Sequence, residues 1–200
     1  MGCVVIMGCT ASRDRTPTIE GANNEENFCF AIECKLKLHN VEFRDYQAAI
    51  KRFGYRVNMT EDHMKQIAPE LNLNIEQMKE NKESPWAVAY LDRDFSFLEG
   101  KHDVENLILM GWLLCKHWND ETQCGELWHI INPELTPFVT KREVLSVITR
   151  LAYIAVNLNY KMLQKCCEDG TAKENALLYH QRINGNRRAF LQDLSARLPD

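Results

Sequence analysis

Several features that define common protein classes are missing from this sequence. The richest apolar run, Leu107 to Cys115, is about half of the roughly 20 residues that a membrane helix needs. The N-terminus lacks the charged segment and the long apolar core of a secretory signal. No basic stripe marks a nucleic-acid-binding surface, and no P-loop or nucleophile elbow points to catalysis. We therefore expect no transmembrane segment, no nucleic-acid partner and no enzymatic activity.

A strong excess of acidic residues is missing as well. The 28 acidic and 24 basic residues leave a net charge of -4, and the isoelectric point is near 5.9. Four working calcium loops would each bring several carboxylates, so this mild acidity argues against a full set of such sites. The 45% hydrophobic content is ordinary for a globular protein. With 200 residues, the chain is long enough for one domain or for two small lobes.

The eight cysteines do not show the CxxC spacing that is typical of zinc and redox motifs. Without an export signal, we interpret them as reduced thiols of a cytoplasmic protein. The residues that could be combined into a zinc site are Cys115, His117, Cys124 and His129. Their spacing matches none of the usual zinc patterns, and helix packing explains Cys115 and His129 better, so we expect no zinc.

Residues 1–24 show little periodicity, and we interpret them as a flexible N-terminal arm. Gly2 is a candidate for myristoylation and Cys3 for palmitoylation, which together would anchor the chain to a membrane. Ile6, however, stands where the myristoylation motif prefers serine or threonine. An unmodified arm is therefore the favoured interpretation, and membrane anchoring is the alternative.

Apolar residues at helical spacing predict an all-α fold. One such face consists of Phe43, Tyr46, Ile50 and Phe53. The stretch from Val104 to Trp118 is apolar on nearly all sides, so it should be a buried helix in which Gly111 permits close packing. The residues expected to cap helices are Thr60, Ser84, Asp103 and Asn119. Near the C-terminus, two short helices at 173–183 and 187–198 should form a hairpin around Asn184-Gly185-Asn186.

The stretch from Cys124 to Val156 predicts a helix, a tight polar loop and a second helix. With Asn132 at position 1 of a twelve-residue loop, Val139 falls at position 8, Thr140 at position 9 and Glu143 at position 12. In a calcium loop, position 12 supplies the bidentate carboxylate. Thr140 and Glu143 also have the spacing of a capping box, which needs no ion.

This stretch resembles the EF-hand superfamily. The segment from Leu107 to Val144 is similar to the second-to-third-hand region of neuronal calcium sensors and calcineurin-B-like proteins, with an apolar exit helix, a short polar break and an entering helix. A weaker similarity extends over Glu25 to Met78. The resemblance implies paired helix-loop-helix units whose loops touch at position 8. In the register expected for the first pair, Leu38 and Leu73 are the touching residues, and Glu42 and Gln77 occupy position 12.

Two loops contain candidate calcium ligands, although both depart from the family pattern. The first set is Asp92, Asp94, Ser96 and Asp103; the second is Asn132, Glu134, Thr136, Thr140 and Glu143. In the first loop, Phe97 stands in the glycine position, which favours a polar linker with Asp103 as the cap of the next helix. In the second, Pro137 stands there, and proline can supply neither the left-handed turn nor the amide.

The resemblance and the lost ligands together favour a non-enzymatic adaptor or structural protein built on degenerate EF-hands. We expect it to bind an amphipathic partner helix or a large cytoskeletal assembly, including a ciliary one, without calcium or another cofactor. The alternative is a calcium sensor that uses one or two residual loops. The expected organisation is an arm at 1–24, hand pairs at 25–83 and 84–160, and a C-terminal helical hairpin at 161–200.

Overall fold

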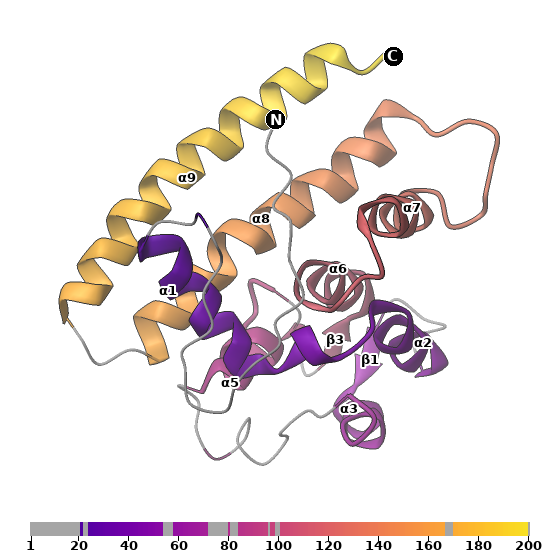
Figure 1. The fold of residues 1–200 in the computed structure, drawn as a ribbon. Coiled ribbons are helices and arrows are strands. Elements are labelled where there is room, and N and C mark those ends of the chain that lie inside the picture. Colours follow the sequence, from indigo (N-terminus) through magenta and orange to yellow (C-terminus); the bar gives the residue numbers. More distant parts are fainter. Residues whose placement is uncertain are drawn as a thin grey trace.

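The computed structural model describes residues 21, 24–53, 58–71, 80, 84–95, 97–98, 101–166 and 170–199. Most of them are helical, which confirms the predicted all-α class (Figure 1). The helices are α1 (Asn24–Glu33), α2 (Phe43–Phe53), α3 (Glu61–Ile67), α5 (Pro85–Leu91), α6 (Val104–Leu114), α7 (Asp120–Ile131), α8 (Lys141–Cys166) and α9 (Gly170–Arg197). Short 3-10 turns at Cys34–Leu36 and Leu38–Asn40 link α1 to α2. The strands are β1 (Asn58–Thr60), β2 (Phe97–Leu98) and β3 (Lys101–Asp103).

Two helix-strand-helix units, α2–β1–α3 and α5–β3–α6, are joined by an antiparallel ladder. Met59 lies opposite His102 at its centre, and β2 pairs with the other edge of β3. The contact expected between Leu38 and Leu73 stays a prediction, because only one of the two residues is described. Leu38 is buried in a 3-10 turn, while Leu73 lies outside the described residues. The boundary expected at residue 83 falls between the two joined units rather than between two separate pairs.

Local capping explains where the helices of these units begin. The hydroxyl of Thr60 accepts a hydrogen bond from the amide of His63 at 3.3 Å, and Ser84 accepts one from Ala87 at 3.1 Å. The carboxylate of Asp103 accepts one from the amide of Asn106 at 2.9 Å. All three caps were predicted, because an oxygen-bearing side chain before an apolar run satisfies amides that have no helical partner.

Helix α8 links much of the fold, because it packs against α1, α5, α6 and α9. Its buried side chains are spaced by three or four residues from Leu151 through Ile154 and Leu158 to Met162, and Leu163 adjoins the last of them. They join a core that also takes residues from α1, α2, α3, α5, α6 and α9. None of the residues 141–150 of α8 is buried, so the helix is held at one end and far more exposed at the other.

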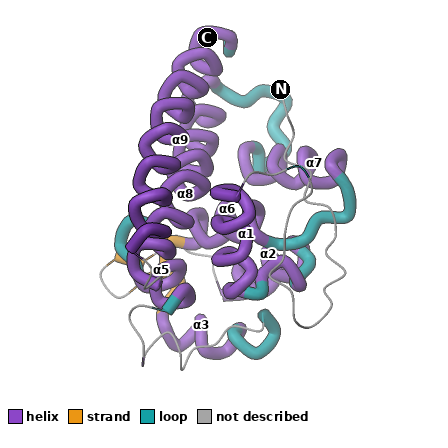
Figure 2. Tube along the Cα trace, turned by 60° about the vertical axis from the view of Figure 1, so that its left-hand side comes forward, coloured by secondary structure: helices purple, strands orange, loops and turns teal. Residues whose placement is uncertain are grey.

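The C-terminal helical hairpin is present, but it is formed by other helices than the two that were predicted. Helix α9 runs unbroken through Asn184-Gly185-Asn186, and its hairpin partner is α8 (Figure 2). A glycine within a helix costs only about 1 kcal/mol relative to alanine. Contacts along α8 outweigh this cost, and the 28-residue helix α9 continues where the local sequence alone predicts a turn.

Gly111 generates a first prediction, because it lies where α6 meets α2. A Cβ atom at Gly111 would stand 2.3 Å from the ring of Tyr46, which is fully buried. The Gly111→Ala variant should therefore lose about 2 kcal/mol or more of unfolding free energy in urea titrations. Gly125→Ala on α7 is the matched control, since a Cβ there meets nothing within 4 Å and alanine favours helix. Equal stability of the two variants would contradict the close approach of α2 and α6.

His102 generates a second prediction. It is completely buried at the centre of the strand ladder, and burial lowers its pKa from 6.5 to about 4 despite the opposing influence of Glu61 and of the Tyr90 backbone. The unfolded chain therefore binds a proton below about pH 6.5 that the folded chain excludes, so this residue makes stability fall between about pH 6.5 and 4, by up to about 3 kcal/mol. In His102→Leu this component should vanish from unfolding curves measured across that range; an unchanged pH slope would show that His102 is not its source.

Candidate functional site

The first candidate loop follows α5, and its acids are paired with cations from α8. The two carboxylate oxygens of Asp92 lie 2.9 Å from Nζ of Lys161 and 3.1 Å from Nζ of Lys165. Lys161 also pairs with the carboxylate of Asp94. Its ammonium lies 5.1 Å from the centre of the buried Phe95 ring, a cation–π distance. The ammonium group of Lys161 thus contacts both carboxylates of this loop, Asp92 and Asp94.

The electrostatics of this cluster favour the charged forms of both partners. Burial opposes ionisation of Asp92, but the Asp94 amide and the two ammonium groups outweigh it and lower the pKa of Asp92. Burial likewise works against the charge of Lys161, and the carboxylates of Asp94 and Asp92 outweigh it and raise the pKa of Lys161. The negative charges of Asp92 and Asp94 are therefore neutralised by ammonium groups of the same chain.

Asp103, the last acid of this set, lies elsewhere. One carboxylate oxygen caps α6, and the other lies 2.9 Å from Nη2 of Arg150 on α8. Arg150 also pairs with Glu105 and donates to Asn106 at 3.1 Å. Asp103 directly follows His102, the residue that pairs with Met59 in the strand ladder. Ser96 lies outside the described residues.

The second candidate loop, between α7 and α8, is closed by its own side chains. The buried amide of Asn132 accepts a hydrogen bond from the amide of Thr136 at 3.0 Å and donates one to the Thr136 carbonyl at 2.9 Å. The left-handed residue of this loop is Leu135, with φ of 52°, whereas the predicted glycine position is Pro137. The left-handed turn thus lies two residues before Pro137, whose fixed φ excludes it from that conformation.

Thr140 and Glu143 form the predicted capping box at the start of α8. The Glu143 carboxylate accepts hydrogen bonds from the amide and the hydroxyl of Thr140, each at 2.7 Å. In return, Thr140 Oγ1 accepts one from the Glu143 amide at 3.3 Å. The hydrogen bonds from Thr140 lower the pKa of Glu143. Both residues are exposed, as is Glu134, so the carboxylate at position 12 serves the helix terminus here.

The remaining candidate residues do not converge. Among the described residues, no group of three or more His, Cys, Asp or Glu side chains has a metal-binding arrangement. Of the set weighed for zinc, Cys115 is buried, Cys124 and His129 are exposed, and His117 pairs with Glu126 at 2.6 Å. Gly2 and Cys3 lie outside the described residues. None of the described helices combines the length and the apolar content that crossing a membrane requires.

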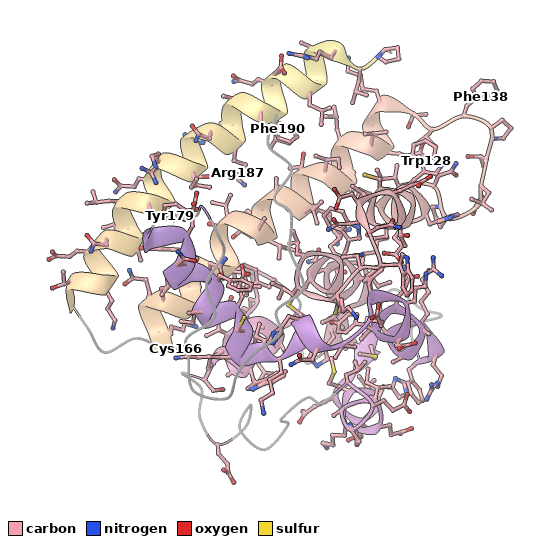
Figure 3. All side chains as sticks on the ribbon, in the orientation of Figure 1. Trp128, Phe138, Cys166, Tyr179, Arg187 and Phe190 are labelled. Carbon is pink, nitrogen blue, oxygen red and sulfur yellow. The ribbon has the colours of Figure 1, made fainter. Side chains whose placement is uncertain are left out.

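The exposed apolar side chains are distributed very unevenly. The large hydrophobic residues with high exposure in the described chain are Trp118, Trp128, Leu135, Phe138, Leu177, Leu178 and Phe190. All of them follow α6, and Phe138 is 90% exposed in the loop between α7 and α8 (Figure 3). Helix α7 has no buried residue at all. Among the described residues, the paired units thus expose no large apolar side chain, while α7, its loop and α9 expose several. We call these together the α7–α9 surface: Trp128, Leu135, Phe138, Leu177, Leu178 and Phe190.

Sequence reasoning missed the cations that complete the first loop. Lys161 and Lys165 are four residues apart, so they lie on one face of α8 and can both reach Asp92. This spacing was a usable signal, but nothing in the sequence indicates which acids, about 70 residues earlier, the lysines approach. No family model, no curated protein and no solved structure matches this chain.

The half-buried ion pair of Asp92 and Lys161 generates a third prediction. A double-mutant cycle of Asp92→Asn and Lys161→Met in urea unfolding should show a coupling energy of about 1–3 kcal/mol, because their side chains are only 10% and 27% exposed. The matched control is the pair Asp62 and Lys65, also closely paired but 80% and 45% exposed, which should couple by at most about 0.5 kcal/mol. Equal coupling in the two cycles would mean that burial gives the Asp92 pair no special strength.

Proposed function

We propose that the protein is a non-enzymatic adaptor, built on degenerate EF-hand-like units, that binds a protein partner without calcium. The observation that carries this proposal is the pairing of Asp92 with Lys161 and Lys165. A calcium ion at this loop would have to displace two ammonium groups that α8 already supplies. An internal cation fixes the loop in one state, whereas an exchangeable ion would switch it between two.

The position of α8 supports the same conclusion. Paired EF-hand units present an apolar face that suits an amphipathic helix, and here the C-terminal half of α8 packs on α5 and α6 with its apolar residues buried. The apolar face of the paired units is thus covered by α8 of the same chain. A partner would therefore meet a different surface.

The α7–α9 surface is the best candidate for that contact. Trp128 is 47% exposed, Phe138 90% and Phe190 52%. Aromatic residues are enriched in the energetically important centres of interfaces, and a partner that covered these side chains would remove them from water. We propose that an apolar helix face or an equivalent apolar segment of the partner covers it.

A calcium titration tests the first half of this proposal. A site of micromolar affinity would stabilise the folded chain by about 4 kcal/mol at a thousand-fold excess of calcium over its dissociation constant. We expect the melting temperature in millimolar calcium to equal that in EDTA. A calcium-dependent rise that is lost in Asp92→Ala would instead establish the sensor alternative.

Site-specific photo-crosslinking tests the second half. A benzophenone amino acid placed at Phe138 should give discrete adducts with one protein in the cells that express the chain. The matched control is the same group at Gln66, which is exposed on α3 of the paired units. The same adducts from both positions would contradict a partner site on the α7–α9 surface.

A further inference from the structure

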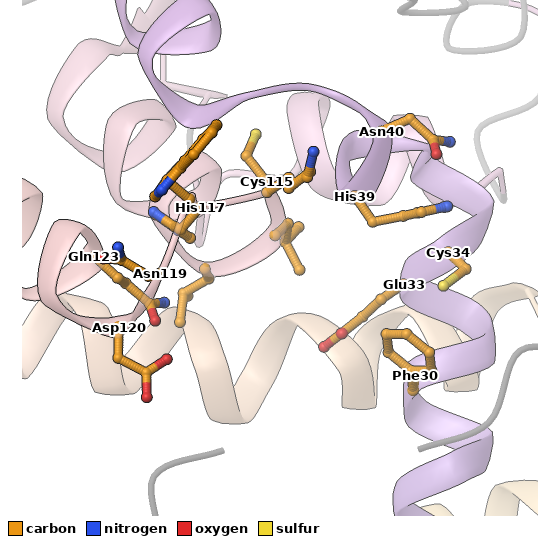
Figure 4. A pocket seen from close by; sticks show the side chains of 14 residues that line it. Phe30, Glu33, Cys34, His39, Asn40, Cys115, His117, Asn119, Asp120 and Gln123 are labelled. Atoms are coloured by element: carbon orange, nitrogen blue, oxygen red, sulfur yellow. The ribbon is translucent and has the colours of Figure 1, made fainter. Parts of the chain in front are cut away.

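A pocket of about 460 Å³ opens between α1 and the segment that joins α6 to α7. Phe30 and Glu33 enter it from α1, and Asn119, Asp120 and Gln123 stand on the opposite wall (Figure 4). Neither loop discussed above contributes to it. The pocket therefore offers a binding site that is separate from the calcium question.

The basic groups of this pocket are already neutralised by neighbours. Nζ of Lys116 lies 2.8 Å from the carboxylate of Glu42. The ring of His117 faces the carboxylate of Glu126 at 2.6 Å and the carbonyl of Trp112 at 2.8 Å. The Lys116 ammonium and the His117 ring are thus directed to partners of their own rather than to a bound anion.

The acidic groups of the pocket are in the opposite situation. Within the described part of the chain, neither Glu33 nor Asp120 pairs with a basic side chain; Glu33 only accepts a hydrogen bond from the amide of Asn159 on α8. Burial raises the pKa of Glu33 to about 7. The cavity is therefore bordered by two carboxylates whose counterion the described residues do not supply.

The other walls suit an aliphatic stem and a flat cation. Phe30, Leu113 and Leu114 line the pocket, and so does Trp118, which is 83% exposed. An accessible indole attracts a cation to its face, by about 0.5–1 kcal/mol at exposed sites. An anion would gain nothing from this combination of aromatic face and unpaired acid.

We propose that this pocket binds an organic cation on a short aliphatic stem, with Glu33 and Asp120 as its counterions and Trp118 as its aromatic wall. The side chain of an arginine or a lysine has this chemistry. As the contact for a basic residue of a protein partner, the pocket would deepen the adaptor role and rests on that proposed function. The binding of the cation itself does not depend on it.

Cation binding should be linked to the ionisation of Glu33. The other titratable groups that line the pocket are Cys34, His39, Cys115, Lys116, His117 and Asp120. A bound cation favours the carboxylate form, so the free protein releases a proton from Glu33 on binding whenever the pH lies below about 7. Affinity should therefore increase as pH rises from about 6 to 8.

The test is a titration of the full chain with Nα-acetyl-arginine amide, followed by the amide NMR signals of Asn119 and Gln123. The neutral control ligand is Nα-acetyl-citrulline amide, which has the same shape without the charge. We expect saturable shifts with the arginine compound and at least about five-fold weaker binding of the citrulline compound, because a charge-assisted contact is lost. Equal affinities, or no shifts with arginine, would overturn the proposal.

Variants locate the effect in the pocket. Glu33→Gln should weaken arginine binding at least about five-fold and remove its pH dependence, whereas Glu134→Gln, an exposed acid in the α7–α8 loop, should change neither. Asp120→Asn provides a second variant at an exposed position and should also weaken binding. Unchanged affinity in both pocket variants would overturn the proposal. This titration needs no partner, so its failure leaves the calcium and crosslinking results standing.

Discussion

The docking of α8 onto the paired helix-strand-helix units is the interaction on which the rest of the structure depends. Its apolar face completes the core, and its cations meet the acids of the first loop and the cap of α6. A lysine inside a folded chain needs a counterion, and an acid beside an apolar core needs one equally. The two requirements satisfy each other here. The resulting arrangement is specific in register, because Lys161 can reach Asp92 only when Leu158 and Met162 enter the core.

The same docking divides the molecule into two parts with different surfaces. The paired units bury their large apolar residues, while α7 buries none of its own and the first ten residues of α8 remain partly or fully exposed. The α7–α8 loop nevertheless has a defined shape, because Asn132 bonds to Thr136 and Thr140 to Glu143. Apolar exposure on an ordered scaffold favours recognition, since little conformational entropy is lost on binding.

Local chemistry made much of the fold predictable. Caps such as Thr60 and Ser84, the close approach at Gly111 and the capping box at Thr140 all follow from interactions within a few residues or from one small side chain. Register was harder. The antiparallel pairing that places Met59 opposite His102, and the small hairpin of β2 and β3, were not predicted.

Several other features that the sequence could not reveal involve distant residues. The pairs Lys161 with Asp92 and Asn159 with Glu33 join positions 69 and 126 residues apart. Nothing near either residue indicates its partner. The break expected at Gly185 failed for the same reason, because contacts with α8 stabilise α9 beyond what its own residues dictate.

The length of α8 has a mechanical consequence. Its 26 residues form a rod of about 39 Å, and Lys141 lies about 30 Å along it from Lys161. The rod is fixed by packing and ion pairs from Val147 to Leu163, and beyond Lys141 it carries the loop that displays Phe138. A load applied at Phe138 would therefore act first on the ion pairs of Arg150 with Asp103 and Glu105, about 14 Å along the rod from Lys141. These pairs stand between the exposed loop and the charges at Lys161, so tilting of the free end must break them before it disturbs that second site.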